Sequence, residues 1–243
     1  MRKYIILILS KIFNKSNPIS LMYHTISDTQ ISIATSINEV RKQFQYLKDN
    51  NYNVIGENET STNSKDIHLT FDDGYVDNFN VLFPILQEFN YKATIFITTG
   101  FLGKEFKYGL SLMTESQIIE LSKSDLITIA SHTVTHPKLD TLTYKEQYME
   151  IANSKKYLEN LIGKEVNIFA PPFGRYNDDT IKILKELGIV KSYTTKIGKL
   201  SYKNLLEIPR VPVMTGTLNY FNCLDKNGFF LYNKIKDKVK SYV

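Results

Sequence analysis

The sequence is poor in cysteine, lacks tryptophan and has no long apolar run. Cys223 is the single cysteine among 243 residues, so the chain forms neither an internal disulfide nor a cysteine-based zinc cluster. One thiol fits a reducing compartment without establishing it. No stretch reaches the roughly 20 apolar residues that a transmembrane helix needs. The 30 basic and 25 acidic side chains are spread along the chain, so we expect no nucleic-acid partner.

Residues 1–17 form a basic, amphipathic segment. Apolar residues recur at helical spacing from Ile5 to Phe13, and Arg2, Lys3 and Lys11 flank them. The first interpretation is a helix packed on the domain, and the second is peripheral membrane contact through residues 1–15. The third, an export signal, has an apolar run at the lower limit of length and no A-x-A cleavage site.

The rest of the chain has the pattern of a helix-covered parallel sheet. The predicted strands are Ile19–Tyr23, Ile67–Phe71, Ala93–Thr98, Leu126–Ala130, Val166–Ala170, Ile189–Thr194 and Ile208–Val213. Amphipathic segments separate them, and two begin with a capping box, at Thr114 with Gln117 and at Thr143 with Glu146. Such alternation predicts an α/β fold in a single domain, either closed into a barrel or doubly wound.

Three polar clusters follow predicted strands, at the end where parallel α/β folds place their chemistry. The first is Thr70–Tyr75, in which the carboxylates of Asp72 and Asp73 are adjacent and precede Gly74. The carboxylates repel each other unless a cation or a proton intervenes. Taken alone, the cluster is also compatible with an ordinary Asp-Asp-Gly turn.

The second cluster, Ser131–Pro137, holds two of the four histidines in the chain. His132 and His136 are four residues apart, so one helical turn would aim both imidazoles at one ion. Two solvated loop histidines are the alternative. With Asp73 the pair provides two nitrogens and one oxygen, an open site for zinc or another divalent metal.

The third cluster, Phe169–Asn177, contains two prolines and Gly174. Prolines fix the loop, and a glycine permits an unusual turn that can hold a backbone N–H toward a cavity as an oxyanion donor. A rigid turn before a helix is the alternative.

The joint pattern resembles the polysaccharide deacetylase family, the NodB-homology domain of carbohydrate esterase family 4. The family's Thr-Phe-Asp-Asp-Gly stands at Thr70–Gly74, its His-Ser/Thr-x-x-His at His132–His136, and its Pro-Tyr-Gly appears as Pro172–Gly174. The resemblance covers roughly Ile19–Val213. It implies a distorted, TIM-like (β/α) barrel of about seven strands over residues 18–243, which removes acetyl groups from carbohydrate with one divalent metal, zinc before others.

The resemblance also implies a role for individual residues. Asp73, His132 and His136 match the metal ligands, and Asp72 matches the general base. Phe173 stands where the family's tyrosine offers its backbone N–H to the oxyanion. Thr133 would steady the histidine loop by hydrogen bonding.

The chain departs from the family at two positions. Many members have an arginine near Ala170 that pairs with the catalytic aspartate, and a histidine on the last strand as general acid. This sequence has neither, although the departing amine needs a proton. His24 resembles the Tyr-His motif of the biofilm-polysaccharide branch and is the candidate acid. Arg210 could replace the missing arginine or make a surface ion pair, and His68 is predicted to be a packed strand histidine.

We therefore predict a carbohydrate N-deacetylase acting on N-acetylhexosamine units of a cell-envelope or extracellular polysaccharide, or of its lipid-linked precursor. A cytoplasmic or inner-membrane-associated location is favoured, and export stays open. Two rivals remain: a mononuclear iron oxygenase with the same ligand set, and a catalytically inactive carbohydrate-binding relative. The oligomeric state is not predicted.

Overall fold

The computed structural model describes residues 2–240, so the predicted boundaries at residue 1 and at residues 241–243 lie outside it. Its strands are β1 (Ile19–Tyr23), β2 (Thr25–Ile26), β3 (Ala34–Thr35), β4 (Asn53–Val54), β5 (Asp66–Phe71), β6 (Ala93–Ile97), β7 (Ile127–Ser131), β8 (Ile168–Phe169), β9 (Lys191–Ser192) and β10 (Val211–Pro212). The α-helices are α1 (Arg2–Ile12), α2 (Ile37–Asp49), α3 (Phe83–Phe89), α4 (Glu115–Ser122), α5 (Tyr144–Ile162), α6 (Asp178–Glu186) and α7 (Asn227–Lys240).

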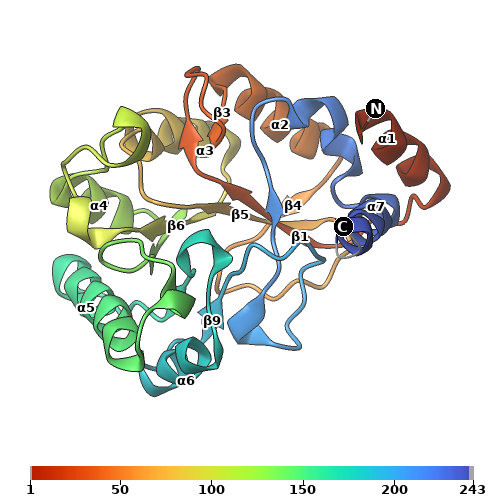
Figure 1. Cartoon of the computed structure of the whole chain (residues 1–243). Helices are drawn as coiled ribbons and strands as arrows, with labels where there is room; N and C mark the ends of the chain where they lie inside the picture. The colour runs from red at the N-terminus through yellow and green to blue at the C-terminus, as the bar shows by residue number, and fades with distance from the viewer. Residues whose placement is uncertain (1, 241–243) are drawn as a thin grey trace.

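One curled parallel sheet organises the molecule. Its strands follow the order β10-β1-β5-β6-β7-β8-β9, and β4 pairs with the start of β5. Helices α2 to α6 cover its outside (Figure 1). A parallel bridge between Tyr193 and Ile208 links the two edges of the sheet. The predicted distorted (β/α) barrel of about seven strands is therefore confirmed.

Local sequence signals set the helix starts. Thr114 and Thr143 both form the predicted capping boxes, with the side chains of Gln117 and Glu146 returning to the cap backbone. Each box satisfies two of the N–H groups that a helix start leaves unpaired.

The last three strands are much shorter than predicted. The sequence predicts a strand from Ile189, but the N–H of Ile189 instead donates to the carbonyl of Leu184 at the end of α6. Pro209 and Pro212 lack the N–H that a longer β10 would need. The chain therefore curls here in short ladders of one or two residue pairs.

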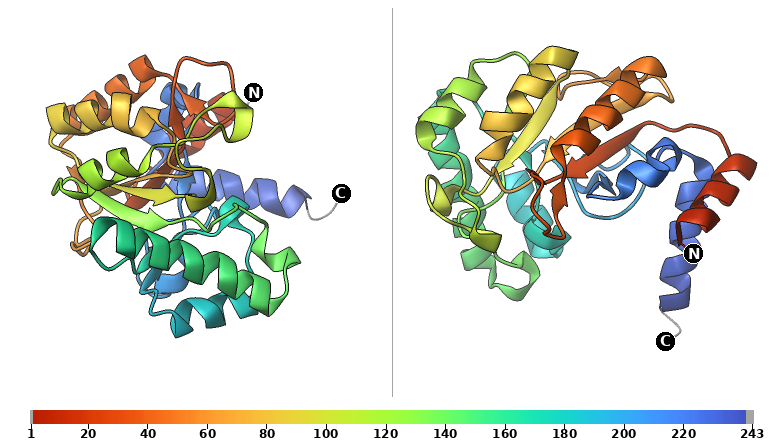
Figure 2. Two further views of the ribbon diagram at one scale, coloured as in Figure 1. Left: turned by 90° about the vertical axis from the view of Figure 1, so that its left-hand side faces the viewer. Right: turned by 90° about the horizontal axis from the view of Figure 1, so that it is seen from above.

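Helix α1 packs on the domain, as the first interpretation of this segment predicts. It lies beside α7 at the edge of the molecule (Figure 2), and it buries Ile6 and Ser10. A Cβ on Gly228 of α7 would come within 2.3 Å of the Leu9 backbone, so only glycine allows this approach. No helix among the described residues is long and apolar enough to cross a membrane.

Candidate active site

The predicted site residues gather where the central strands end. Asp72 and Asp73 directly follow β5, His132 directly follows β7, and His24 directly follows β1. Neighbouring parallel strands bring these carboxyl ends to one rim of the barrel. The three stretches are far apart in sequence but adjacent in space.

Asp73, His132 and His136 form a compact, buried group. One ligand atom from each residue lies within 4.8 Å of the other two. Oδ1 of Asp73 is 3.0 Å from Nε2 of His136 and 3.6 Å from Nε2 of His132. One carboxylate and two imidazoles that share a centre and leave positions open are a common ligand set for zinc and iron.

The hydrogen bonds of His132 show that this group fits a cation. Nδ1 of His132 lies 2.7 Å from the carbonyl oxygen of Ala170, which can only accept, so Nδ1 carries the proton. The lone pair of Nε2 therefore faces Asp73 Oδ1, which has no hydrogen-bond partner of suitable geometry among the described residues. Burial lowers the pKa of His132 to about 4 and keeps the ring neutral. Two facing acceptors require a positive charge between them, and a backbone-bound imidazole is typical of metal ligands.

The two histidines do not meet through a helical turn, contrary to the sequence expectation. Residues 132–138 form an irregular loop in which Thr133 and His136 have left-handed backbones, with φ of 69° and 60°. Asp73 and Phe173 also have positive φ, of 74° and 59°. Such conformations cost about 1–2 kcal/mol for a residue with a Cβ. These four are among seven positive-φ non-glycine residues in the described region, and strain of this kind concentrates at functional sites.

Hydrogen bonds hold the histidine loop in this shape. Thr133 Oγ1 accepts a hydrogen bond from the N–H of His136 at 3.0 Å, the steadying contact that the family resemblance implies. Glu150 of α5 accepts from the N–H groups of Val134 and Thr135 at 2.9 and 2.8 Å. Sequence reasoning missed Glu150, because nothing local in the sequence links it to the loop.

Arg210 and Asp72 form a buried ion pair. Arg210 is fully buried, and its guanidinium contacts both carboxylate oxygens of Asp72, at 2.6 and 2.8 Å. It also donates to Thr70 Oγ1 and to the carbonyl of Thr194. Burial, the largest single influence, would raise the pKa of Asp72, but the charge and hydrogen bonds of Arg210 together with the charge of nearby histidines outweigh it, and the pKa lies below its usual value. Arg210 thus lies where the missing arginine is needed, and the alternative of a surface ion pair is wrong.

His24 lies at the same rim and is partly buried. It directly follows β1, which pairs with β5, so its backbone lies at the strand ends beside Asp72 and Asp73. Asn78 anchors its backbone by donating to the His24 carbonyl at 3.0 Å. His24 therefore lies on the β1 side of the aspartates, while the histidine loop follows β7 on their other side.

The mouth of the site carries an aromatic ring and a lysine. Phe173 is half-exposed, and its ring centroid lies 4.6 Å from that of His136. Nζ of Lys107 lies 2.6 Å from Nδ1 of His136 and 4.3 Å from the centroid of the Phe173 ring. Lys107 was not predicted, because the sequence marks its segment only as a loop. Lys107 therefore lies between the histidine loop and the Phe173 ring at the mouth.

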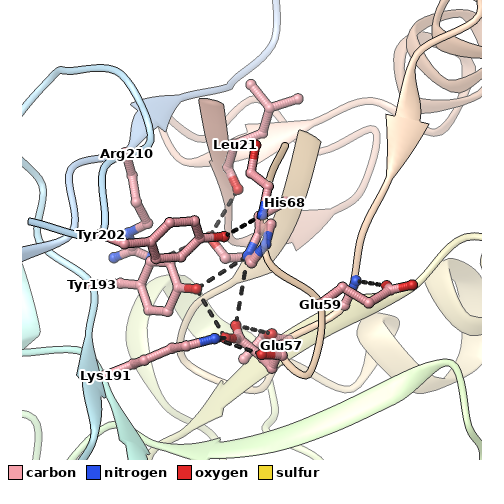
Figure 3. A network of polar contacts seen from close by, with 12 residues as sticks. Leu21, Glu57, Glu59, His68, Lys191, Tyr193, Tyr202 and Arg210 are labelled. Atoms are coloured by element: carbon pink, nitrogen blue, oxygen red, sulfur yellow. Dashed lines mark hydrogen bonds and ion pairs between the residues drawn. The ribbon is translucent and has the colours of Figure 1, made fainter. Parts of the chain in front are cut away.

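A second polar cluster lies deeper in the barrel. Glu57 accepts hydrogen bonds from Tyr193 Oη at 2.9 Å and from Lys191 Nζ at 3.1 Å, while Tyr193 Oη lies 3.1 Å from Nδ1 of His68. Figure 3 shows these four side chains converging, with Arg210 alongside. His68 is buried within the barrel, away from the rim, as predicted for a packed strand histidine.

Removal of a ligand side chain should abolish metal retention. We expect Asp73→Asn and His136→Ala to purify with less than about one tenth of the wild-type divalent metal, because two ligands rarely hold such an ion. Elemental analysis by mass spectrometry after dialysis measures this. Asp140→Asn, at a carboxylate outside the group, is the control. Wild-type metal content in either ligand variant would refute the assignment.

Loss of Arg210 should cost far more stability than loss of an exposed arginine. Arg210→Met leaves Asp72 buried without its partner, and we expect a loss of about 3–5 kcal/mol in the free energy of unfolding. The control is Arg41→Met, which breaks an exposed pair with Glu88 and should cost less than about 1 kcal/mol. Urea unfolding followed by circular dichroism compares the two, and similar losses would contradict the importance of the buried pair.

Comparison with known proteins agrees with this geometry. Residues 59–191 match the polysaccharide deacetylase family. The chain is 33% identical over 205 residues to YxkH of Bacillus subtilis, a protein assigned to the polysaccharide deacetylases, with 81% of this chain and 71% of the relative covered. It is 25% identical over 243 residues to the poly-β-1,6-N-acetyl-D-glucosamine N-deacetylase of Escherichia coli, covering 79% of this chain but only 36% of that enzyme.

Solved structures give the same answer for the fold. The Streptococcus pyogenes deacetylase PplD, in complex with acetate, superposes with a TM-score of 0.76 at 28% identity, covering 87% of this chain and 98% of that one. IcaB from Ammonifex degensii superposes with a TM-score of 0.79 at 21% identity, covering 86% and 97%, and supports the fold alone. Both agree with the barrel described above.

The family match excludes the iron-oxygenase alternative and agrees with the predicted enzyme class at the level of a carbohydrate deacetylase. His24 and Arg210 lie outside the matched residues 59–191, so their roles depend on the geometry of this chain. The chain belongs to the polysaccharide deacetylase family.

Proposed function

We propose that this chain hydrolyses the N-acetyl groups of N-acetylhexosamine units in a cell-envelope or extracellular polysaccharide, or in its lipid-linked precursor. The observation that carries the proposal is the pairing of the Asp73, His132 and His136 group with the buried, Arg210-bound carboxylate of Asp72. The relatives named for poly-β-1,6-N-acetyl-D-glucosamine support the substrate class.

Asp73, His132 and His136 would hold one divalent cation, and two imidazoles with one carboxylate favour zinc. When bound, such an ion supplies Lewis-acid polarisation of a carbonyl and lowers the pKa of water. The protein's own part is to leave Nε2 of His132 unprotonated and to keep the Asp73 carboxylate ionised. The hydrogen bond from His132 to Ala170 fixes the first of these conditions.

Asp72 acts as the general base in this proposal. Its carboxylate stays ionised because Arg210 contacts both oxygens, so it can take a proton from the attacking water. The water oxygen bonds to the acetyl carbon, and the backbone N–H of Phe173 stabilises the charge that develops on the acetyl oxygen. The half-exposed ring of Phe173 provides an apolar surface for a sugar at the mouth.

His24 completes the reaction as the general acid. The C–N bond of the amide breaks, and the amine nitrogen leaves with the proton that His24 donates. Acetate and a free amino sugar are the products. This role is supported by the position of His24 at the end of β1, next to the aspartates that follow β5, and by the absence of any other described histidine at the rim outside the ligand group.

The direct test is acetate release. We expect the purified protein to release acetate from N-acetylglucosamine oligomers or lipid-linked N-acetylated sugars, and a chelator to abolish this. Asp72→Asn should retain metal yet release acetate at least about a hundredfold more slowly, the usual range for loss of a general base. A metal-replete protein that is inert on every acetylated glycan would instead support the inactive carbohydrate-binding relative.

A comparison of amide with ester substrates should distinguish a general-acid role of His24 from a structural one. We expect His24→Ala to reduce kcat by about a hundredfold or more on an N-acetyl sugar, because the departing amine needs a proton. On an activated acetate ester, such as p-nitrophenyl acetate, the loss should be much smaller, since that leaving group needs none. Equal losses on both substrates would make His24 a structural residue.

A further inference from the structure

Helix α1 carries an exposed apolar face that the barrel does not cover. The face, which we call the α1 outer face, consists of Tyr4, Ile5, Ile8 and Ile12. These side chains are 64%, 39%, 58% and 65% exposed. Tyr4, Ile8 and Ile12 are spaced four residues apart, so they form one stripe along the helix. The buried side chains of α1, Ile6 and Ser10, lie on the opposite side.

The packing of α1 on α7 fixes the direction of this face. The N–H of Gly228 donates to the carbonyl of Phe13 at 3.0 Å. A Cβ on Gly228 would meet the Leu9 carbonyl group at 2.3 Å, so the two backbones are in direct contact. α1 therefore cannot roll to bury the stripe without losing this contact. Ile235 of α7, 51% exposed, adds a further apolar side chain from the helix that packs on α1.

The charge around the α1 outer face is mainly positive. The chain contains no acidic residue before Asp28, and in that stretch it carries four basic residues, Arg2, Lys3, Lys11 and Lys15. The neighbouring helix α7 adds Lys234 and Lys236 against a single acidic residue, Asp237. An apolar stripe flanked by lysine and arginine is the arrangement of helices that lie in the headgroup region of anionic membranes.

We propose that the α1 outer face binds the surface of an anionic lipid bilayer. An eleven-residue helix is only ~16 Å long, about half the thickness of the hydrocarbon core, so α1 lies along the surface. The apolar stripe enters the boundary between headgroups and acyl chains, and the basic side chains contact lipid phosphates. Figure 2 shows α1 at the outer edge of the molecule, away from the sheet, where a flat surface can reach it.

This proposal does not depend on the deacetylase mechanism, because no residue of the α1 outer face belongs to the site. Its occupant is a lipid surface rather than a second copy of the chain, since two copies meeting through this face would bring like charges together. The charge asymmetry, not the apolar area alone, decides between these occupants.

The test is co-sedimentation of the full chain with vesicles. We expect binding to vesicles that mix phosphatidylglycerol with phosphatidylcholine, weaker binding to phosphatidylcholine alone, and weakening of the former at high salt. Ile8→Glu combined with Ile12→Glu should reduce binding to the mixed vesicles by at least about tenfold, since each exposed isoleucine loses its apolar burial. The matched control, Met149→Glu with Val190→Glu, changes two apolar residues elsewhere that are about half exposed and should bind like wild type.

Two further measurements distinguish loss of membrane binding from misfolding and from a change in oligomeric state. Acetate release from a soluble substrate should be the same in the Ile8→Glu, Ile12→Glu variant and in wild type, which shows an intact barrel. Sedimentation velocity should show that wild type and this variant have the same oligomeric state. The proposal is overturned if the wild-type chain ignores anionic vesicles, if both double variants bind equally, or if the Ile8→Glu, Ile12→Glu variant dissociates a dimer.

Discussion

The ion pair between Arg210 and Asp72 is the interaction on which the site depends. Asp72 and Asp73 are consecutive carboxylates, each only 3% exposed, and two buried neighbouring charges repel each other strongly. Arg210 neutralises the first through two direct contacts. The carboxylate of Asp73 then remains available to the imidazoles of His132 and His136. One buried guanidinium thus makes two adjacent aspartates chemically different.

The strand pairs of the sheet differ in length between its two sides. The ladders of β1 with β5 and of β6 with β7 each contain five residue pairs, and they carry His24, both aspartates and His132 at their ends. Strands β8, β9 and β10 form ladders of only one or two pairs. The irregular side supplies Phe173 and Arg210, which must reach inward from a loop or a strand edge. The long ladders therefore place His24, the aspartates and His132 at one rim, and the short strands close the barrel beside them, although the β5–β6 ladder between them has only two pairs.

Backbone strain is the cost of bringing the ligands together. Asp73, Thr133, His136 and Phe173 all have left-handed backbones, a conformation that disfavours side chains with a Cβ. Glu150 offsets part of this cost by accepting two backbone N–H groups of the histidine loop. Gly74 needs no compensation, because its φ of 83° is accessible to glycine and a Cβ there would come within 2.9 Å of Ile97.

Local sequence determined much of this protein. Hydrophobic alternation predicted the helix-covered parallel sheet, and the family resemblance selected the barrel. Thr114 and Thr143 predicted their helix caps, and the motifs around Asp73 and His132 predicted which residues meet. These features are local because strand ends, caps and tight turns depend on a few consecutive residues. The tertiary structure alone decided that Arg210 is buried against Asp72, that Glu150 holds the histidine loop and that Lys107 lies at the mouth. It also decided that Ile8 and Ile12 face outward while Ile6 faces inward. Contacts between residues dozens of positions apart depend on how the strands curl and how α1 meets Gly228. Helical spacing alone cannot say which side of an apolar helix its neighbour covers.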